Sequence, residues 1–202
     1  TSLRLRAAGV ASPPTWATES AAQAQRIVMR ESAAGHALVL KPLFGSQGKG
    51  LQRVGWVGGV HVPLPVLDDG LGGLAYLQRF IAAPQSPGFD WRVLVVGGRA
   101  VAAMRRVSEH WIHNIAQGAC SAPVELTPAL AGPAEEAARA LEMDYAGVDL
   151  MPARGGETQV LEVNGVAAWQ GLQRVTPFNI ARAIVDDLFD RKLALAGRSM
   201  QA

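Results

Sequence analysis

The stretch from Val148 to Asn164 constrains the fold more than any other part of the sequence, because two strand-like segments in it are joined at Gly155-Gly156. A glycine pair between such segments is a strong signal for a two-residue hairpin turn. With that turn, Asp149 lies directly opposite Glu162, and Asn164 follows on the same face. The other face carries apolar side chains that suit a core: Val148, Leu150, Leu161 and Val163.

The polar face of this hairpin predicts a metal site. Two carboxylates at a cross-strand distance of roughly 5 Å repel each other unless a proton or a cation lies between them. Two carboxylates and an amide provide only oxygen ligands, which suit a hard cation such as Mg²⁺. We therefore expect Asp149, Glu162 and Asn164 to be metal ligands. The alternative is a solvated hairpin whose polar face carries acids by chance.

Composition excludes several classes of protein. No apolar run in the 202 residues approaches the ~20 needed to span a bilayer, and no signal-like leader opens the chain. The net charge is +2 and the arginines are scattered, so neither a membrane nor a nucleic acid is an expected partner. The single Cys120 is consistent with a reducing cytoplasm. Because the chain starts at Thr1 within an apparent helix, we expect further sequence upstream.

Two of the three lysines, Lys41 and Lys49, lie in one short segment. Lys41 ends a buried strand, and a glycine-rich loop containing Gly45, Ser46, Gln47, Gly48 and Lys49 leads to the next strand. The exposed amides of such a loop can cover phosphate oxygens, with lysine charge added. The spacing fits neither a Walker loop nor a dinucleotide fingerprint, and a plain flexible hairpin tip is the alternative.

Local signals place the other elements. We expect strands over residues 37–42, 51–54 and 74–81, and helices over 2–8, from Ser20 to about Ser32, from Thr127 to about Met143 and from Thr176-Pro177 to about Leu195. Ile180, Ile184 and Leu188 form one apolar stripe on the last helix. The breaks at Pro84 and Pro87 suggest a hinge between domains.

A second hairpin is predicted around Gly97-Gly98. In that register Asp90 pairs with Arg105. The Asp90 side chain points to the same face of the sheet as Arg92, whereas Arg106 points to the other face. An ordinary surface ion pair is the alternative reading of these charges. His113 is a lone histidine, and such residues are more often found in a core or on a surface than in catalysis.

The chain contains the following motifs in this order: Lys41, the glycine loop, Gln78-Arg79-Phe80-Ile81, Asp90-x-Arg92, Asn114 and Asp149…Glu162-x-Asn164. This ordered set resembles the ATP-grasp superfamily, and most closely its RimK-type glutamate ligases. The resemblance implies an α+β fold in which two subdomains with antiparallel sheets clasp ATP. It implies an opening segment over residues 1–15 that packs on the carboxy-terminal subdomain, a first subdomain with the flap over 16–81, and a second with the metal site over 82–202.

The resemblance also implies a role for each matching residue. Lys41 and the loop residues Gly45, Ser46, Gln47, Gly48 and Lys49 would hold the phosphates, and backbone groups of Arg79 and Phe80, with Gln78 and Ile81, would line adenine. Asp90 would face the ribose, and His113 and Asn114 would lie near the phosphates. The metal ligands would be Asp149, Glu162 and Asn164, with Mg²⁺ as the expected metal and Mn²⁺ as the alternative. Arg92 or Arg106 would stabilise the oxyanion, and Arg92 is preferred because it shares a face with Asp90.

The implied reaction joins a carboxylate to an amine through an acyl phosphate at the expense of ATP. Three departures concern the rest of the enzyme: the family's amino-terminal domain is absent, Ile112 replaces a usual arginine, and Gly165–Gly171 replaces the usual Asn-x-x-Pro-Gly continuation. We therefore expect glutamate or a similar amino acid to be added to a cofactor or small-acid acceptor. The alternatives are an ATP-binding module or inactive fragment that needs a partner domain, and a structural domain without nucleotide; a homo-oligomer is left open.

Overall fold

A computed structural model describes residues 1–42, 45, 47–68, 71–153 and 156–193. The described chain divides into two compact units, one formed by Thr1–Ser12 with Ala83–Ala202 and the other by Pro13–Ala82. Each unit contains one five-stranded sheet, and every strand pair in both sheets is antiparallel. The predicted α+β class with antiparallel sheets is therefore confirmed.

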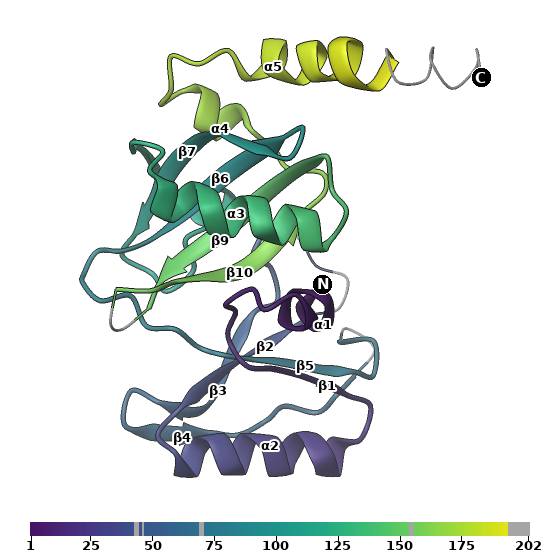
Figure 1. The fold of residues 1–202 in the computed structure, drawn as a ribbon. Coiled ribbons are helices and arrows are strands. Elements are labelled where there is room, and N and C mark those ends of the chain that lie inside the picture. Colours follow the sequence, from purple (N-terminus) through teal and green to yellow (C-terminus); the bar gives the residue numbers. More distant parts are fainter. Residues whose placement is uncertain (43–44, 46, 69–70, 154–155, 194–202) are drawn as a thin grey trace, which may run out of the picture. The chain divides into compact units, whose positions relative to one another are not determined.

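The smaller unit is a sheet covered on one face by a single helix (Figure 1). Its strand order is β1-β5-β2-β3-β4. The elements are β1 (Thr15–Thr18), α2 (Ala21–Ala33), β2 (Ala37–Lys41), β3 (Gln52–Val57), β4 (Val60–Val62) and β5 (Ala75–Arg79). Helix α2 begins as expected, because the Ser20 side chain accepts a hydrogen bond from the Gln23 amide.

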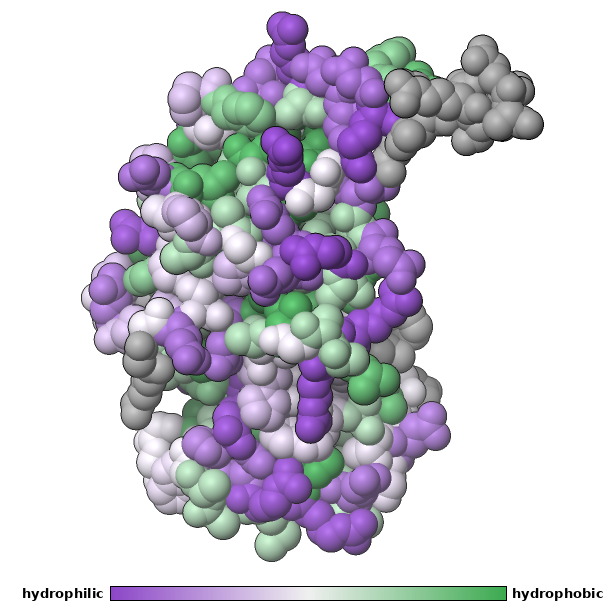
Figure 2. Space-filling model, viewed as in Figure 1, coloured by the Kyte–Doolittle hydropathy of each residue, from purple (hydrophilic) through white to green (hydrophobic). Residues whose placement is uncertain are grey.

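Helix α2 packs its apolar stripe on this sheet. Ile27 and Val28 are buried with Leu38, Leu40 and Leu77 in one core. Figure 2 shows hydrophilic side chains, with a few apolar ones among them, over the outward face of α2. The helix is thus amphipathic, with Ile27 and Val28 on its buried face.

The larger unit has the strand order β10-β9-β6-β7-β8. Helix α3 lies across one face of this sheet (Figure 1), where α1 also packs. The elements are α1 (Ser2–Ala7), β6 (Gly88–Val96), β7 (Arg99–Ser108), η2 (Ile115–Gln117), β8 (Cys120–Pro123), α3 (Pro128–Ala140), β9 (Tyr145–Pro152), β10 (Thr158–Asn164), α4 (Gln170–Gln173), α5 (Ile180–Asp186) and η3 (Asp187–Leu193). On the other face, residues of α4 and α5 pack against β6 and β7 in a second core.

The central hairpin has the predicted pairing where its polar residues lie. Glu162 is opposite Asp149, as expected. A β-bulge between Val160 and Glu162 shifts the register on the side of the turn, so Val160 is fully buried and Leu161 is only partly buried. The expectation that Leu161 belongs to the core is therefore wrong, and Val160 takes its place. The turn residues Arg154 and Gly155 lie outside the described part of the chain.

The second hairpin also contains a bulge, and this one changes the predicted site. The turn has two residues, Gly97 and Gly98, both with positive φ, as expected. The register then shifts between Leu94 and Val95, which leaves Val101 as an extra residue of β7. The pairings beyond this point differ from those of an unbroken ladder.

The start of the last helix was predicted too early. The Gln173 side chain donates to the carbonyls of Thr176 and Phe178 and accepts from the Ile180 amide, so residues 176–178 form a loop. The helix begins at Ile180, where the Asn179 side chain caps it by accepting from the Arg182 amide. Of the predicted apolar stripe, Ile180 is buried, Ile184 is partly buried and Leu188 is exposed. The expected end near Leu195 lies outside the described residues.

Candidate functional site

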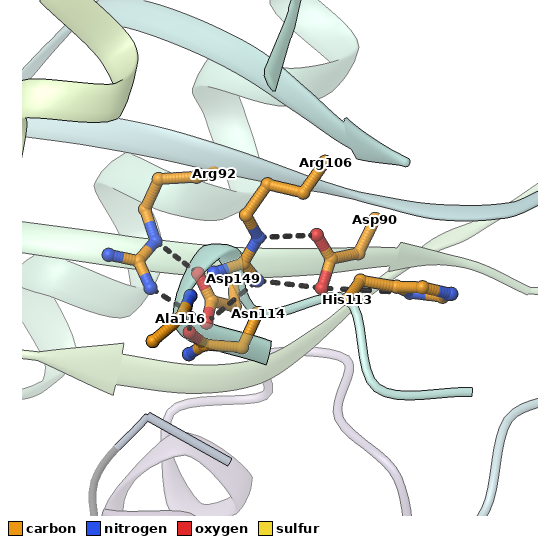
Figure 3. A network of polar contacts seen from close by, with 7 residues as sticks. All are labelled: Asp90, Arg92, Arg106, His113, Asn114, Ala116 and Asp149. Atoms are coloured by element: carbon orange, nitrogen blue, oxygen red, sulfur yellow. Dashed lines mark hydrogen bonds and ion pairs between the residues drawn. The ribbon is translucent and has the colours of Figure 1, made fainter. Parts of the chain in front are cut away.

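Three neighbouring strands of the larger unit bring four charged side chains together (Figure 3). Asp90 and Arg92 come from β6, Arg106 from β7 and Asp149 from β9. Asp90 pairs directly with Arg106, and Arg92 pairs directly with Asp149. Two expectations are therefore wrong, namely that Asp90 pairs with Arg105 and that Arg92 and Arg106 face opposite ways. The bulge at Val101 reverses the direction of the β7 side chains beyond it.

The four side chains form a connected network of ion pairs. The Arg106 Nε and Nη2 donate to Asp90 Oδ1 and Oδ2 at 2.7 and 2.6 Å, and Nη2 also lies 3.0 Å from Asp149 Oδ2. The Arg92 Nε donates to Asp149 Oδ1, and its Nη2 donates to Oδ2 at 3.0 Å. None of these side chains is more than 11% exposed. The network is therefore buried, which contradicts the alternative of a surface ion pair.

Burial raises the pKa of each of the two carboxylates, whereas the neighbouring arginines lower it. Burial would raise the pKa of Asp149, but Arg106 and Arg92 outweigh it and hold the pKa below its ordinary value. Burial raises the pKa of Asp90 to about 6, because Arg106 offsets the loss of hydration only in part. Both carboxylates are ionised at neutral pH, so the charges of the two acids and the two arginines cancel.

His113 and Asn114 lie at the edge of this network. His113 is buried, and its Nδ1 lies 3.9 Å from Asp90 Oδ2. Burial, with a smaller contribution from Arg106, lowers the pKa of His113 to about 4, so its ring is neutral at neutral pH. The Asn114 side chain accepts from the Ala116 amide and caps η2. His113 can therefore offer hydrogen bonds but no positive charge to a phosphate.

The donors on β9 and β10 fit a hard cation. Asp149 and Glu162 are cross-strand partners, Glu162 is exposed, and Asn164 follows two positions along β10. The arginines use three of the roughly four lone-pair positions of the Asp149 carboxylate, which leaves about one for a metal. Within the described ranges, no three or more His, Cys, Asp or Glu side chains form a metal-binding group. A cation bound by two carboxylates and an amide would complete its shell with water or phosphate oxygens, as Mg²⁺ usually does.

Tyr145 is a residue of this region that the sequence did not single out. Its hydroxyl donates to the Ala167 carbonyl at 2.6 Å, and Ala167 is buried. A Cβ on Gly147 would lie 2.5 Å from the Ala167 Cβ, so only glycine fits there. The segment after Asn164, which departs from the family pattern, is thus fixed to β9. An isolated tyrosine gave no sequence signal, because its partner is a backbone carbonyl.

The smaller unit carries its predicted residues on the sheet face that α2 leaves open. Val39 pairs with Gln78 on one side and with Arg53 on the other, so these three side chains lie in one row. Lys41 follows Val39 by two positions and shares its face. The Arg53 guanidinium lies over the Phe80 ring at 5.3 Å from its centroid. Arg53 is therefore a second residue that the sequence analysis missed.

The segment expected to contact adenine is held by hydrogen bonds of its own. The Arg79 amide donates to the Pro14 carbonyl and the Phe80 amide to the Ala37 carbonyl, both at 2.9 Å. Two of the backbone groups expected to read adenine therefore already have partners, and any backbone contact there must use other groups of residues 79–81. Ile81 is partly buried at the end of this segment.

The glycine-rich loop is described only in part. Gln47, Gly48 and Gly50 all have positive φ, and a Cβ on Gly50 would lie 2.8 Å from Pro42 Cγ. Gly45 and Lys49 are exposed. Ser46, which we also expected to contact phosphate, lies outside the described residues. The positive φ values explain why the loop is rich in glycine.

Comparison with solved structures defines the class of the fold. The chain is similar to the ATP-grasp ligase PsnB complexed with a phosphomimetic variant of its minimal precursor, Mg and ADP, with a TM-score of 0.69 and 19% identity over 94% of this chain and 57% of that one. It is also similar to D-alanine–D-alanine ligase from Bacillus anthracis, with a TM-score of 0.62 and 16% identity over 98% of this chain and 67% of that one. The fold is the ATP-grasp fold, as predicted.

Sequence comparison narrows the class to a family. The model of the RimK-like ATP-grasp domain matches residues 2–188, so the chain belongs to the RimK-like ATP-grasp family. Tetrahydromethanopterin:alpha-L-glutamate ligase from Methanococcus maripaludis is 38% identical over 152 residues, which are 74% of this chain and 51% of that protein. The enzyme of that name from Methanocaldococcus jannaschii is 36% identical over 153 residues, 74% and 52% of the two chains. This chain thus spans about half the length of these relatives.

Proposed function

We propose that this chain is the nucleotide-binding part of an ATP-dependent carboxylate–amine ligase. The observation that carries the proposal is the buried network in which Arg92 and Arg106 hold Asp149 directly opposite Glu162. A structural sheet gains little from such an arrangement, because burying charges costs free energy even when they are paired. The same arrangement suits a site that must bind phosphates and metal together.

The proposed roles are given for each unit by itself. In the larger unit, Asp149, Glu162 and Asn164 would hold Mg²⁺, while Asp90 faces the ribose and His113 and Asn114 offer hydrogen bonds to phosphate. In the smaller unit, Lys41 and the described loop residues from Gly45 to Lys49 would bind phosphates, and Gln78 to Ile81 would line adenine. When bound, Mg²⁺ neutralises phosphate charge and orients the transferred group.

The proposed reaction begins with attack of an acceptor carboxylate on the γ-phosphate of ATP, which breaks the bond to the β–γ bridging oxygen and releases ADP. The acyl phosphate that forms is then attacked by an amine, and phosphate leaves as the amide bond forms. Arg92 is the preferred residue to stabilise the tetrahedral oxyanion, because Arg106 is already shared between two carboxylates and is more deeply buried. Removing water from the site protects the acyl phosphate from hydrolysis.

The acceptor is proposed to be a cofactor or another small molecule with a carboxylate, and the added group glutamate or a similar amino acid. The support is the name of the relatives, tetrahydromethanopterin:alpha-L-glutamate ligase, which names both a small-molecule acceptor and glutamate. The cytoplasm stays our prediction for its location. No described helix has the length and apolar character needed to cross a bilayer.

The metal assignment can be tested at an exposed residue. Glu162→Gln removes one carboxylate from the proposed site without breaking the buried network, so we expect the affinity for Mg·ATP, measured by calorimetry, to fall about tenfold or more. Glu157→Gln is the matched control, because Glu157 is an exposed acid in the same hairpin. Equal Mg·ATP affinity of Glu162→Gln and the wild type would show that the metal site is misassigned. Asp149→Asn is less suitable, because it leaves two buried arginines without their partner.

Turnover separates the ligase from the second candidate, an ATP-binding module that depends on a partner domain. The chain spans about half the length of these relatives, so both candidates are tested on it directly. The ligase releases ADP when a carboxylate acceptor and glutamate are added to Mg·ATP. The module binds Mg·ATP but releases no ADP with any acceptor.

A further inference from the structure

A buried acid lies behind the segment proposed to bind adenine. Glu31, in the last turns of α2, is 4% exposed. Its Oε2 accepts from the Arg79 Nε and Nη2 at 3.0 and 2.6 Å, and its Oε1 accepts from the Arg30 Nε and Nη2 at 3.2 and 3.1 Å. Neither the sequence motifs nor the proposed reaction assigns a role to Glu31.

The contact with Arg79 is stronger than a usual surface pair. Both donors of one edge of the guanidinium point at one carboxylate oxygen, and the carboxylate is shielded from water. Burial would raise the pKa of Glu31, but the hydrogen bonds and charges of Arg79 and Arg30 outweigh it and hold the pKa below its ordinary value. The acid is thus ionised at neutral pH. A cation near the carboxy-terminal end of α2 is also favoured by the helix dipole.

The pair lies on the sheet face opposite to the proposed nucleotide face. Side chains alternate along β5, so Arg79 shares the face of Ala75 and Leu77, which pack with α2 in one core. Gln78 points to the other face, in the row with Val39 and Arg53. Glu31 therefore cannot touch a nucleotide bound on that row, and any influence on binding must pass through Arg79.

The main chain of Glu31 is also linked to the proposed adenine segment, through His36 and Ala37. Its carbonyl accepts from the His36 amide at 2.9 Å, just before Ala37 receives the amide of Phe80 at 2.9 Å. The side chain thus ties the end of α2 to the end of β5, and the main chain ties the loop after α2 to the residue that follows Arg79.

We propose that Glu31 is a positioning residue for adenine binding, which fixes the main chain at Arg79–Ile81 by holding the Arg79 guanidinium against α2. This inference rests on the proposed function of the site. The base at position 79 is tolerated because Glu31 neutralises it.

The proposal makes a prediction about adenine specifically. Glu31→Gln keeps the shape of the side chain but removes its charge, so we expect Mg·ATP to bind this chain about tenfold more weakly. Binding of Mg·tripolyphosphate, which has no adenine, stays unchanged. The reversed pair, Glu31→Arg with Arg79→Glu, restores at least part of the affinity for Mg·ATP. Arg30→Gln is the control, because it removes the exposed partner of Glu31 and leaves the contact with Arg79.

Calorimetric titrations of the folded chain and these variants decide the question. If Glu31→Gln binds Mg·ATP as tightly as the wild type does, the positioning role alone is overturned. The same holds if Glu31→Gln loses equal affinity for Mg·ATP and for Mg·tripolyphosphate, because that result indicates general loosening of the unit. Arg79→Lys keeps the charge but lacks the forked donor geometry, so it tests the same contact with less risk to folding, and a selective loss for Mg·ATP supports the proposal. A wild-type chain that binds no Mg·ATP overturns the proposed function together with this inference.

Discussion

At the scale of single residues, Asp149 lies at the centre of the buried charges, because Arg92 and Arg106 both bind its carboxylate. Spacing in one hairpin was sufficient to place Glu162 opposite Asp149. That Arg92 and Arg106 both bond to Asp149 depends on the alignment of three strands far apart in the chain. The alternation of apolar and polar residues fixes which way a side chain points, but it does not identify the partner on the next strand.

His113 makes the larger unit sensitive to acid. Its pKa is about 4 in the folded protein and 6.5 in the unfolded chain, so between these values the unfolded chain binds a proton that the folded one does not. Stability is therefore complete above pH 6.5 and falls as the pH drops toward 4. Between pH 7 and 4.5 we expect His113→Asn to lose about 2 kcal/mol less unfolding free energy than the wild type, as measured by urea denaturation.

The exposed His61 provides the comparison for this experiment. His61→Asn should show the acid dependence of the wild type. If His113→Asn and the wild type lost equal amounts of stability over the same pH range, the histidine would not be buried in a neutral form.

At the scale of elements, one predicted helix start was correct and another was wrong. Ser20 marked the start of α2 correctly, because a side-chain cap depends on residues within one turn. The start of α5 was predicted at a plausible Thr-Pro pair, but Gln173 holds that segment in a loop and Asn179 provides the cap. The short strands β1 and β8 gave no signal, because four residues are too few for a clear alternation.

The bulge in β10 can be tested by truncating two neighbouring residues. Val160 is fully buried and Leu161 is only partly buried. We expect Val160→Ala to lower the unfolding free energy by about 2 kcal/mol and Leu161→Ala by less than about 1 kcal/mol, although leucine loses more atoms. Urea denaturation of both variants measures the difference. A larger loss for Leu161→Ala would mean that β10 follows the unbroken register.

At the scale of the whole molecule, each unit has a core of its own. Leu77 is fully buried in the smaller unit and Leu150 in the larger one. We expect either leucine-to-alanine change to cost about 3 kcal/mol, because it leaves a cavity that its surroundings fill only in part. Amide hydrogen exchange should show the loss of protection in the affected unit, within 13–82 for Leu77→Ala and outside that range for Leu150→Ala. Loss throughout the chain in either variant would mean that the two cores unfold as one.

The fold class and the family motifs could be predicted because they depend on local pattern and on residue order along the chain. The hairpin turn at Gly97-Gly98 is of this kind, since two consecutive residues with positive φ favour glycine. Glu31 and Tyr145 could not be predicted as parts of a site. Their partners, Arg79 and the Ala167 carbonyl, are brought near them only by the completed sheets.

The extra residue Val101 has a consequence for how this family can vary in length. Because Val101 is the extra residue of the bulge, deleting it alone would restore an unbroken ladder and leave Arg106 opposite Asp90, whereas adding one more residue to this arm would turn the Arg106 side chain to the other face. Deleting two other residues of this arm would keep the direction of the Arg106 side chain but move it opposite Arg92 instead of Asp90. The bulge therefore allows this arm of β7 to lose one residue without losing the Asp90–Arg106 pair, and the exposed segment 85–87 lies outside the ladder and does not affect it.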